Sequence, residues 1–288
     1  MITGKTTVCG VIGDPIEHTM SPVMHNAAYK KLGLDYVYVA FRVDKADLGK
    51  AVAGMRALNI RGLNVTIPHK VAIMPFLDEL DPLAEKIGAV NTVVNNNGVL
   101  RGCNTDATGF LQALLAKGVR PEGKTVAILG AGGASRGISF ILAERGANLV
   151  ILNRKLELDW AVDLARRVSE VFKKQAEALE LNEPNLAKTL AGAEILVNAT
   201  SVGMSPDIDS TPVPGRLLRP GLLVFDIVYN PIQTRLIKDA EAAGAKTISG
   251  IDMLAWQGAQ AFEMWTGQPA PVELMKREAI KVLQGHEK

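Results

Sequence analysis

The feature that most constrains the fold is a glycine-rich stretch near the middle of the chain, Gly-Ala-Gly-Gly-Ala-Ser-Arg-Gly at residues 130–137. An apolar run at 125–129 precedes it, and an amphipathic run at helical spacing follows it. Strand, tight turn and helix in this order are typical of the start of a nucleotide-binding βαβ unit. Glycines let the backbone approach a pyrophosphate, which the N-terminus of the helix attracts. Ser135 stands at the third glycine position of the usual fingerprint, so an ordinary glycine-rich turn is the alternative.

The end of the next strand indicates which dinucleotide is bound. The apolar run 148–152 leads into Asn153, Arg154 and Lys155. NAD sites usually place an acid here, which binds the ribose 2′-hydroxyl. An arginine instead can grip a 2′-phosphate with two parallel hydrogen bonds. The stretch therefore favours NADP over NAD, with a solvated charged loop as the alternative.

The composition is typical of a globular protein and excludes several classes of function. The 288 residues suggest one to two domains, and 48% of them are hydrophobic and 22% charged. A net charge of +2 with no basic tract predicts no nucleic-acid partner. Cys9 and Cys103 are too few for a disulfide scaffold and suit a reducing cytoplasm. The chain has neither a signal peptide nor an apolar run of about 20 residues, so we expect a cytoplasmic protein without a membrane partner. A homodimer is left open.

Alternating strand and helix signals predict an α/β protein with a mainly parallel sheet. Strands are predicted at 6–12, 36–43, 62–67, 89–94, 99–103, 125–129, 148–152, 194–198, 222–227 and 246–249. Asn96-Asn97-Gly98 predicts a hairpin turn. Three helices are predicted in the first lobe: one after the N-cap Ser21, one from Asp44 towards Leu58 and one from Asp106 to near Gly118. A helix from Leu158 carries Val162, Ala165, Val168 and Phe172 on one face, and two more follow, over 252–265 and after Pro271. The polar stretch 173–188 has no assignable boundaries.

The position of the glycine fingerprint predicts two domains. It begins near residue 125, so roughly the first hundred residues form a separate α/β lobe. We assign residues 1–106 to a substrate-binding and catalytic domain that the C-terminal helices, 252–288, complete. Residues 107–251 are assigned to a Rossmann-like NADP-binding domain with a parallel sheet. The cleft between the lobes is the predicted reaction site.

Four polar clusters interrupt the apolar elements of the first lobe. They are Thr19 with Ser21, Asn64 with Thr66 and Lys70, Asn91 alone, and Asn104 with Asp106. Hydroxyls, amides, one ammonium and one carboxylate suit a small polyhydroxylated ligand, and each cluster lies at a strand end or helix start, where α/β sheets place their sites. No metal-ligand spacing is present. The alternatives without a role in function are helix caps for Ser21 and Asp106, a solvated side chain for Lys70, and surface or structural roles for His25 and His69.

Read together, the motifs of this chain resemble those of the shikimate dehydrogenase family, including its quinate/shikimate members. The resemblance covers nearly the whole chain. Besides the loop at 130–137 and Asn153-Arg154, the motifs are His18-Thr-Met-Ser-Pro22, Asn64-Val-Thr-Ile-Pro-His-Lys70, Gly88-Ala-Val-Asn-Thr92, Gly102-Cys-Asn-Thr-Asp106, Asn198-Ala-Thr-Ser-Val-Gly-Met204, Asp226-Ile-Val-Tyr-Asn-Pro231, Gly250-Ile-Asp-Met-Leu254 and Gln257-Gly-Ala259.

The resemblance implies reversible NADPH-dependent reduction of 3-dehydroshikimate to shikimate, in the shikimate pathway of aromatic amino acid and chorismate biosynthesis. It implies Lys70 and Asp106 as the catalytic pair, which also bind substrate. The other implied substrate contacts are Thr19, Ser21 and Tyr229 at the carboxylate and Thr66, Asn91 and Gln257 at the ring hydroxyls. The implied cofactor contacts are Gly130, Ala131, Gly132, Gly133, Ala134, Asn153, Arg154, Lys155, Thr200, Ser201, Ile227 and Gly250. It implies no metal.

The chain departs from the family pattern at two positions. Thr19 stands where the family usually has serine, and its extra methyl lies near the end of the ligand at which quinate differs from shikimate. Lys155 stands where threonine is frequent, and a second cation should favour NADP further. The alternatives are a quinate/shikimate dehydrogenase that uses NAD or NADP, and a non-catalytic ligand-sensing protein on the same fold. The presence of both Lys70 and Asp106 argues against a sensor.

Overall fold

The computed structural model describes residues 2–285, which divide into two compact units. Unit 1 contains residues up to Gly109 together with those from Ala255 onward, and unit 2 is Phe110–Leu254. Two helices, α4 (Thr105–Ala116) and α9 (Gly250–Thr266), continue from one unit into the other. The predicted domain boundaries lie three residues earlier in the chain: the first lobe was predicted to end at residue 106 instead of Gly109 and to resume at residue 252 instead of Ala255. Among the described helices, none is long and apolar enough to cross a membrane.

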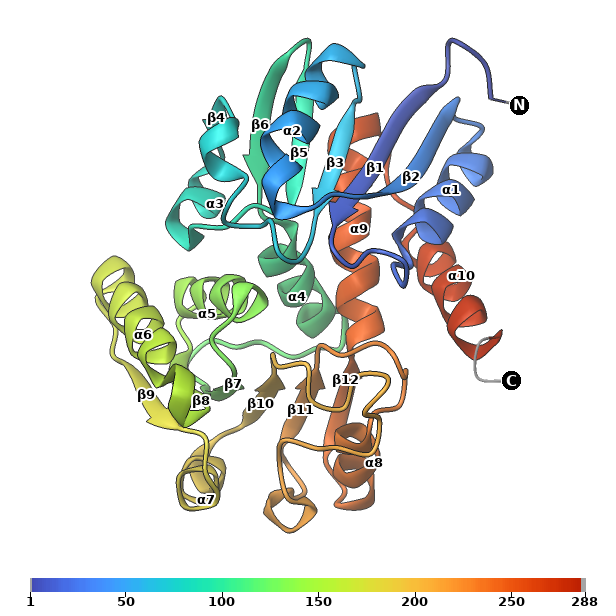
Figure 1. Ribbon diagram of the computed structural model, residues 1–288. Helices are drawn as coiled ribbons and strands as arrows, with labels where there is room; N and C mark the ends of the chain where they lie inside the picture. The colour runs from blue at the N-terminus through green and yellow to red at the C-terminus, as the bar shows by residue number, and fades with distance from the viewer. Residues whose placement is uncertain (1, 286–288) are drawn as a thin grey trace. The chain divides into compact units, whose positions relative to one another are not determined.

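Unit 1 is built on a six-stranded mixed sheet (Figure 1). Its strands, in the order in which they neighbour one another, are β2 (Tyr36–Arg42), β1 (Thr7–Gly13), β3 (Gly62–Val65), β5 (Thr92–Asn96), β6 (Val99–Cys103) and β4 (Glu79–Leu80). The sheet is parallel from β2 to β3, but β5 is antiparallel to both β3 and β6. The expected hairpin lies between β5 and β6, and because β5 is antiparallel to both of its neighbours, this half of the sheet is mixed rather than mainly parallel.

Helices cover both faces of this sheet. One face packs its apolar residues against α2 (Leu48–Ala57) and α3 (Pro82–Ile87). The other face meets α1 (Ser21–Leu32), the C-terminal half of α9 and α10 (Val272–Gly285), where Figure 1 shows α1 and α10 side by side. Trp265 of α9 anchors this layer, because its buried indole N–H donates to the carbonyl oxygen of Val93 at 3.1 Å. The last two helices of the chain therefore complete the core of the N-terminal lobe.

Unit 2 contains a second six-stranded sheet, in which every strand is parallel to its neighbours. The order is β9 (Ala176–Glu180), β8 (Asn148–Asn153), β7 (Thr125–Leu129), β10 (Ile195–Asn198), β11 (Leu223–Asp226) and β12 (Lys246–Ser249). Numbered from β7, this is the order 3-2-1-4-5-6 of a Rossmann fold, whose ligands bind beyond the carboxyl ends of the strands. One apolar core lies between this sheet, α7 (Glu183–Gly192) and α8 (Arg235–Ala242). The helices α5 (Gly133–Glu144) and α6 (Leu158–Phe172) contact β7 and β8.

Several local predictions need correction. Ser21 is not the N-cap of α1; Met20 holds that position, and the helix begins at Ser21 itself. Asp44 precedes a short 3-10 turn, Lys45–Asp47, without a capping hydrogen bond from its side chain. Val162 of α6 is exposed, because Ala161, Leu164, Ala165 and Val168 form the buried stripe. The strand predicted from residue 89 begins only at Thr92.

Candidate active site

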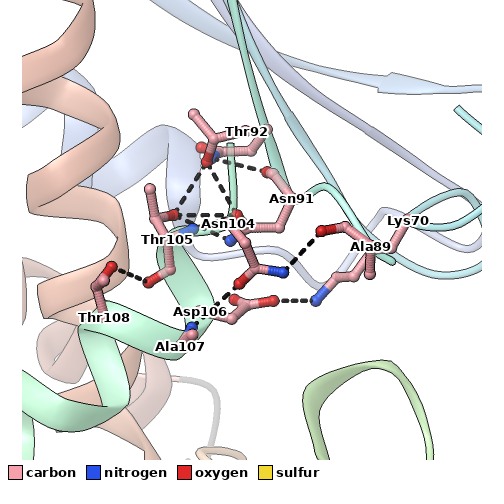
Figure 2. A network of polar contacts seen from close by, with 10 residues as sticks. Lys70, Ala89, Asn91, Thr92, Asn104, Thr105, Asp106, Ala107 and Thr108 are labelled. Carbon is pink, nitrogen blue, oxygen red and sulfur yellow. Dashed lines mark hydrogen bonds and ion pairs between the residues drawn. The ribbon is translucent and has the colours of Figure 1, made fainter. Parts of the chain in front are cut away.

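The central feature of unit 1 is an ion pair between Lys70 and Asp106 (Figure 2). Lys70 lies in the turn that follows β3 and Pro68, and Asp106 is the second residue of α4. The ammonium nitrogen is 2.6 Å from a carboxylate oxygen, and the two side chains are only 18% and 11% exposed. An ammonium in this setting can stabilise negative charge that develops on a ligand oxygen and supply a proton to it.

Asn104 caps the start of α4, so the carboxylate of Asp106 is free to pair with Lys70. The side-chain oxygen of Asn104 accepts the backbone N–H of Ala107 at 3.1 Å, and its amide nitrogen donates to the carbonyl oxygen of Ala89 at 2.9 Å. Asn104 therefore caps the helix, as asparagine commonly does. The alternative in which Asp106 is merely a helix cap is wrong.

Asn91 ties the same helix start to the strand β5. Its side-chain oxygen accepts the backbone N–H of Thr105 at 2.6 Å, and its amide nitrogen donates to the Thr105 hydroxyl at 3.0 Å. The Thr92 hydroxyl lies 3.0 Å from the Thr105 hydroxyl and 3.2 Å from the Asn91 oxygen. Figure 2 shows these side chains converging beside the Lys70–Asp106 pair. Buried amides and hydroxyls that are fully bonded in this way keep fixed orientations.

The remaining predicted substrate contacts of unit 1 lie on α1, α9 and the loops after β1 and β3. The hydroxyl of Thr19 accepts the backbone N–H of the buried Ser21 at 3.3 Å, so these two residues lie together. Thr66 is partly buried and Gln257, on α9, is buried. Tyr229 belongs to unit 2, where it follows β11, so its joint action with Thr19 and Ser21 stays a prediction.

The two histidines near these residues have structural surroundings. His69 is fully buried, and its Nε2 lies 2.6 Å from the carbonyl oxygen of Val43. His25 is fully buried among aromatic rings, and burial lowers its pKa to about 3, so the ring is neutral. The thiols of Cys9 and Cys103 are buried and free, and burial raises the pKa of each to about 12, which makes them poor nucleophiles. Within residues 2–285, no three His, Cys, Asp or Glu side chains are grouped as a metal site requires.

The glycine-rich loop of unit 2 has the geometry of a phosphate cradle. Gly130 has a φ of +95°, and a Cβ there would lie 3.0 Å from a Thr200 methyl and 3.1 Å from the Ala199 carbonyl oxygen, so this turn requires glycine. Gly132 immediately precedes α5, and a Cβ on it would meet no other described atom within 4 Å. The N-terminus of α5 therefore has open space beside Gly132, which is the kind of site that attracts a phosphate.

Ser135 explains the imperfect fingerprint. It is fully buried, and its hydroxyl donates to the carbonyl oxygen of Gly130 at 2.6 Å. The serine therefore closes the loop with a hydrogen bond that a glycine could not make. The alternative of an ordinary glycine-rich turn does not fit a loop that joins a central parallel strand to a helix in this way.

The segment after β8 presents its cations on the surface. Asn153 is buried, and its amide donates to the carbonyl oxygen of Glu157 at 2.7 Å, which closes the short turn Lys155–Glu157. Arg154 is exposed, and its guanidinium forms two hydrogen bonds with the Glu157 carboxylate, one of them 2.7 Å long. These bonds lower the pKa of Glu157. A 2′-phosphate would have to compete with this carboxylate for Arg154.

A buried carboxylate organises the carboxyl ends of β10 and β11. Asp226 accepts hydrogen bonds from the Asn198 amide at 2.9 Å, the Val228 backbone N–H at 3.1 Å and the Thr234 hydroxyl at 2.6 Å. Asn198 in turn accepts from the Thr200 hydroxyl at 2.7 Å. Gly250 lies close to Ile227, since a Cβ there would be 2.2 Å from its carbonyl oxygen. Two of the predicted nicotinamide-end residues, Thr200 and Ile227, therefore bond to Asn198 of this framework, and Gly250 lies against Ile227. Asn198, Asp226 and Thr234 were not predicted individually, although Asn198 and Asp226 end apolar strands.

Asp226 should make stability depend on pH. Burial raises its pKa from 3.8 to about 6, so the folded state binds this proton more tightly than the unfolded state does. The stabilisation of the fold that comes from this tighter proton binding is therefore complete below about pH 4, and it is lost as the pH rises through about 6. We expect the free energy of unfolding of wild type minus that of Asp226→Asn to fall by about 2–3 kcal/mol over this range. Urea unfolding at several pH values measures this difference, and a constant difference would contradict it.

Two parts of the chain match models of a known protein family. Residues 11–93 match the family model described as the shikimate dehydrogenase substrate binding domain, and residues 250–280 match the shikimate 5′-dehydrogenase C-terminal domain. The chain is 49% identical, over the full length of both proteins, to the shikimate dehydrogenase (NADP(+)) of Dehalococcoides mccartyi strain CBDB1.

Solved structures agree with this match. A crystal structure of a shikimate dehydrogenase in complex with NADP+ is 44% identical, with a TM-score of 0.93 over 98% of both chains. The shikimate 5-dehydrogenase of Listeria monocytogenes, in complex with shikimate and NAD, is also 44% identical, with a TM-score of 0.91 over 96% of this chain and 97% of that one. Identity at this level over nearly the whole length establishes the relationship, and the chain belongs to the shikimate dehydrogenase family.

Proposed function

We propose that this protein is a shikimate dehydrogenase, which reversibly reduces 3-dehydroshikimate to shikimate with NADPH in the shikimate pathway. The observation that carries the proposal is the Lys70–Asp106 pair, 2.6 Å apart and mostly buried within a network of amides and hydroxyls. A ligand-sensing protein has no need of an ammonium held in this way. The pair suits a reaction in which a ketone oxygen acquires negative charge and then a proton.

The substrate is assigned to side chains that match its polar groups. Thr19, Ser21 and Tyr229 offer hydroxyl donors to the carboxylate, while Thr66, Asn91 and Gln257 offer partners for the ring hydroxyls. Lys70 is assigned to the ketone oxygen, with Asp106 orienting the ammonium and accepting a hydrogen bond from a neighbouring substrate hydroxyl. The orientation of Asn91 is already fixed by its bonds to Thr105, so little ordering is needed when the substrate binds.

The residues of unit 2 fit an NADP molecule. The loop from Gly130 through Ala131, Gly132 and Gly133 to Ala134 would hold the pyrophosphate, and Asn153, Arg154 and Lys155 would hold the adenosine phosphate. The framework of Thr200, Ser201, Ile227 and Gly250 would hold the nicotinamide end. When bound, the cofactor supplies the hydride that reduces the ring ketone. Lys70 stabilises the alkoxide oxygen and donates a proton to it, and in the reverse direction it accepts that proton.

The proposal is tested by an assay of absorbance at 340 nm that pairs shikimate and quinate with NADP and NAD. We expect the highest kcat/KM with shikimate and NADP. Faster turnover of quinate with NAD would favour the quinate alternative. Binding of shikimate without turnover of either compound would favour the sensor and overturn the proposal.

The cellular setting is part of the proposal. Two buried free thiols suit the reducing cytoplasm in which we place the enzyme. A homodimer stays a prediction, and light scattering on the purified protein tests it.

Thr19 provides a prediction about substrate choice. Its hydroxyl can donate to a carboxylate as serine does, but its methyl takes up room at that end of the ligand. One methyl in a pocket discriminates by only about 1–3 kcal/mol, so Thr19→Ser should change the shikimate-to-quinate ratio of kcat/KM by roughly ten- to two-hundredfold and leave the Kd of NADP unchanged. Wild-type shikimate turnover should still exceed quinate turnover. An unchanged ratio would show that position 19 has no part in this choice.

A further inference from the structure

Tyr38 is a buried tyrosine at the centre of β2 that the family motifs do not include. Only 1% of it is exposed. One face of its ring stacks on His25, with centroids 4.3 Å apart and planes 3° from parallel, and Trp265 lies 6.0 Å away. The ring is therefore fixed on the sheet face that α1 and α9 cover. Its hydroxyl donates to the side-chain oxygen of Asn64 at 2.7 Å.

The hydrogen bonds of Asn64 can run in only one direction. Its amide nitrogen lies 3.3 Å from the carbonyl oxygen of Asn91 and 3.0 Å from the Thr92 hydroxyl. A backbone carbonyl only accepts, so the amide nitrogen of Asn64 must face it and the amide oxygen must face Tyr38. The phenol is therefore the donor. Burial raises the pKa of Tyr38 well above its ordinary value, which keeps that proton in place.

The chain of hydrogen bonds continues from Asn64 to the start of α4, next to the catalytic pair. Asn64 lies opposite Thr92 across the β3–β5 pairing, and the Thr92 hydroxyl bonds Asn91 and Thr105. Thr105 is adjacent to Asp106 in α4. One buried hydroxyl is thus linked, through Asn64 and Thr92, to Asn91, the residue assigned to a ring hydroxyl.

We propose that Tyr38 is a positioning residue for the substrate, acting through Asn64 and Thr92 on Asn91. The inference rests on the proposed function, because Asn91 is assigned there to the substrate. Removing the phenol hydroxyl would leave the buried oxygen of Asn64 without this donor, which is costly. If the Asn64 amide rotated to find another donor, its oxygen would face the carbonyl oxygen of Asn91, and two acceptors would then meet. Both outcomes loosen or turn the Asn64 amide, which donates to the Asn91 carbonyl oxygen and to the Thr92 hydroxyl that bonds the Asn91 side chain.

The test is Tyr38→Phe, which keeps the ring and removes only the hydroxyl. We expect the KM for shikimate to rise about tenfold, with kcat and the Kd of NADP changed less than about twofold. A purely structural role would lower the fraction of folded enzyme, which reduces the apparent kcat and leaves KM unchanged. The KM therefore separates positioning from stability. A KM within about twofold of wild type would overturn the inference.

Tyr29→Phe is the matched control. Tyr29 is equally buried in the same aromatic group, 5.2 Å from Phe262, but its hydroxyl has no hydrogen-bond partner among the described residues. It should leave the KM unchanged, and an equal rise in both variants would contradict a specific role for Tyr38.

A double mutant tests the route through Asn64. If Tyr38 acts by way of Asn64, Tyr38→Phe should not raise the KM further in an Asn64→Ala background, whereas an additive rise would overturn this route. Wild-type protein that does not oxidise shikimate would remove the proposed function together with the inference. Wild-type activity with an unchanged KM in Tyr38→Phe would remove only the inference.

Discussion

Lys70→Ala is expected to lower kcat by about 10²–10⁴-fold while changing the KM for shikimate little, because general acid–base help of this kind contributes that much to a rate. The ammonium is mostly buried and held 2.6 Å from Asp106, so it is oriented before the substrate arrives. Alanine removes both the stabilising charge and the proton donor. The carboxylate and hydroxyl contacts assigned to other residues would remain, which is why KM should change less than kcat.

Steady-state kinetics in both directions measures this effect, with Lys124→Ala as the control. Lys124 also forms an ion pair 2.7 Å long, with Glu194, but in unit 2 and on the surface. Its removal should leave kcat unchanged. A decrease of less than tenfold in Lys70→Ala would exclude the lysine from the chemistry.

Asp106→Asn examines the other member of the pair. The amide keeps an oxygen towards Lys70 but loses the charge that orients the ammonium, so kcat should also fall. Residues that act as one unit show non-additive losses. The double mutant should therefore be no slower than the slower single mutant, and multiplied losses would show that the two residues act separately.

The sequence predicted most strands of both sheets, because their β-branched apolar runs are bounded by glycine, proline or asparagine. It did not predict β9 and α7, within the stretch 173–188. The strand β9 lies at the sheet edge and reads Ala-Glu-Ala-Leu-Glu, so it buries little apolar surface and lacks a hydrophobic signal. The helix α7 had a usable signal, since the Asn182 side chain caps it and Pro184 lies in its first turn. The helix α3 carries the same signal, because the Asp81 side chain caps it and Pro82 is its first residue.

The sequence predicted the types of residue in the candidate site more fully than the contacts among them. Which of two polar residues caps a helix depends on backbone angles, and Asn104, not Asp106, has the capping position in α4. The sequence indicates only that Tyr38 belongs to a strand, because the residue pattern of β2 gives no reason to distinguish it from its neighbours. Its bond to Asn64 joins residues 26 positions apart in the sequence. Such contacts arise from the registers of three neighbouring strands, which a single sequence does not specify.

Arg154→Ala is expected to weaken NADP far more than NAD, because only NADP carries the 2′-phosphate that a guanidinium would bind. In the structure Glu157 holds this guanidinium by two hydrogen bonds, but both groups lie at the surface, where such pairs are weak and a doubly charged phosphate can replace the carboxylate. We expect the ratio of Kd for NAD to Kd for NADP to fall roughly ten- to a hundredfold.

Fluorescence titration of both cofactors measures that ratio, with Arg166→Ala as the control. Arg166 is another exposed arginine of the same unit that pairs with Asp163 and Glu170 on α6, and its loss should leave the ratio unchanged. Glu157→Gln should move the ratio in the opposite direction, because it removes the negative charge that competes with the 2′-phosphate. Equal losses of NAD and NADP affinity in Arg154→Ala would show that Arg154 does not select the cofactor, and the assignment of the 2′-phosphate would then pass to Lys155 or fail.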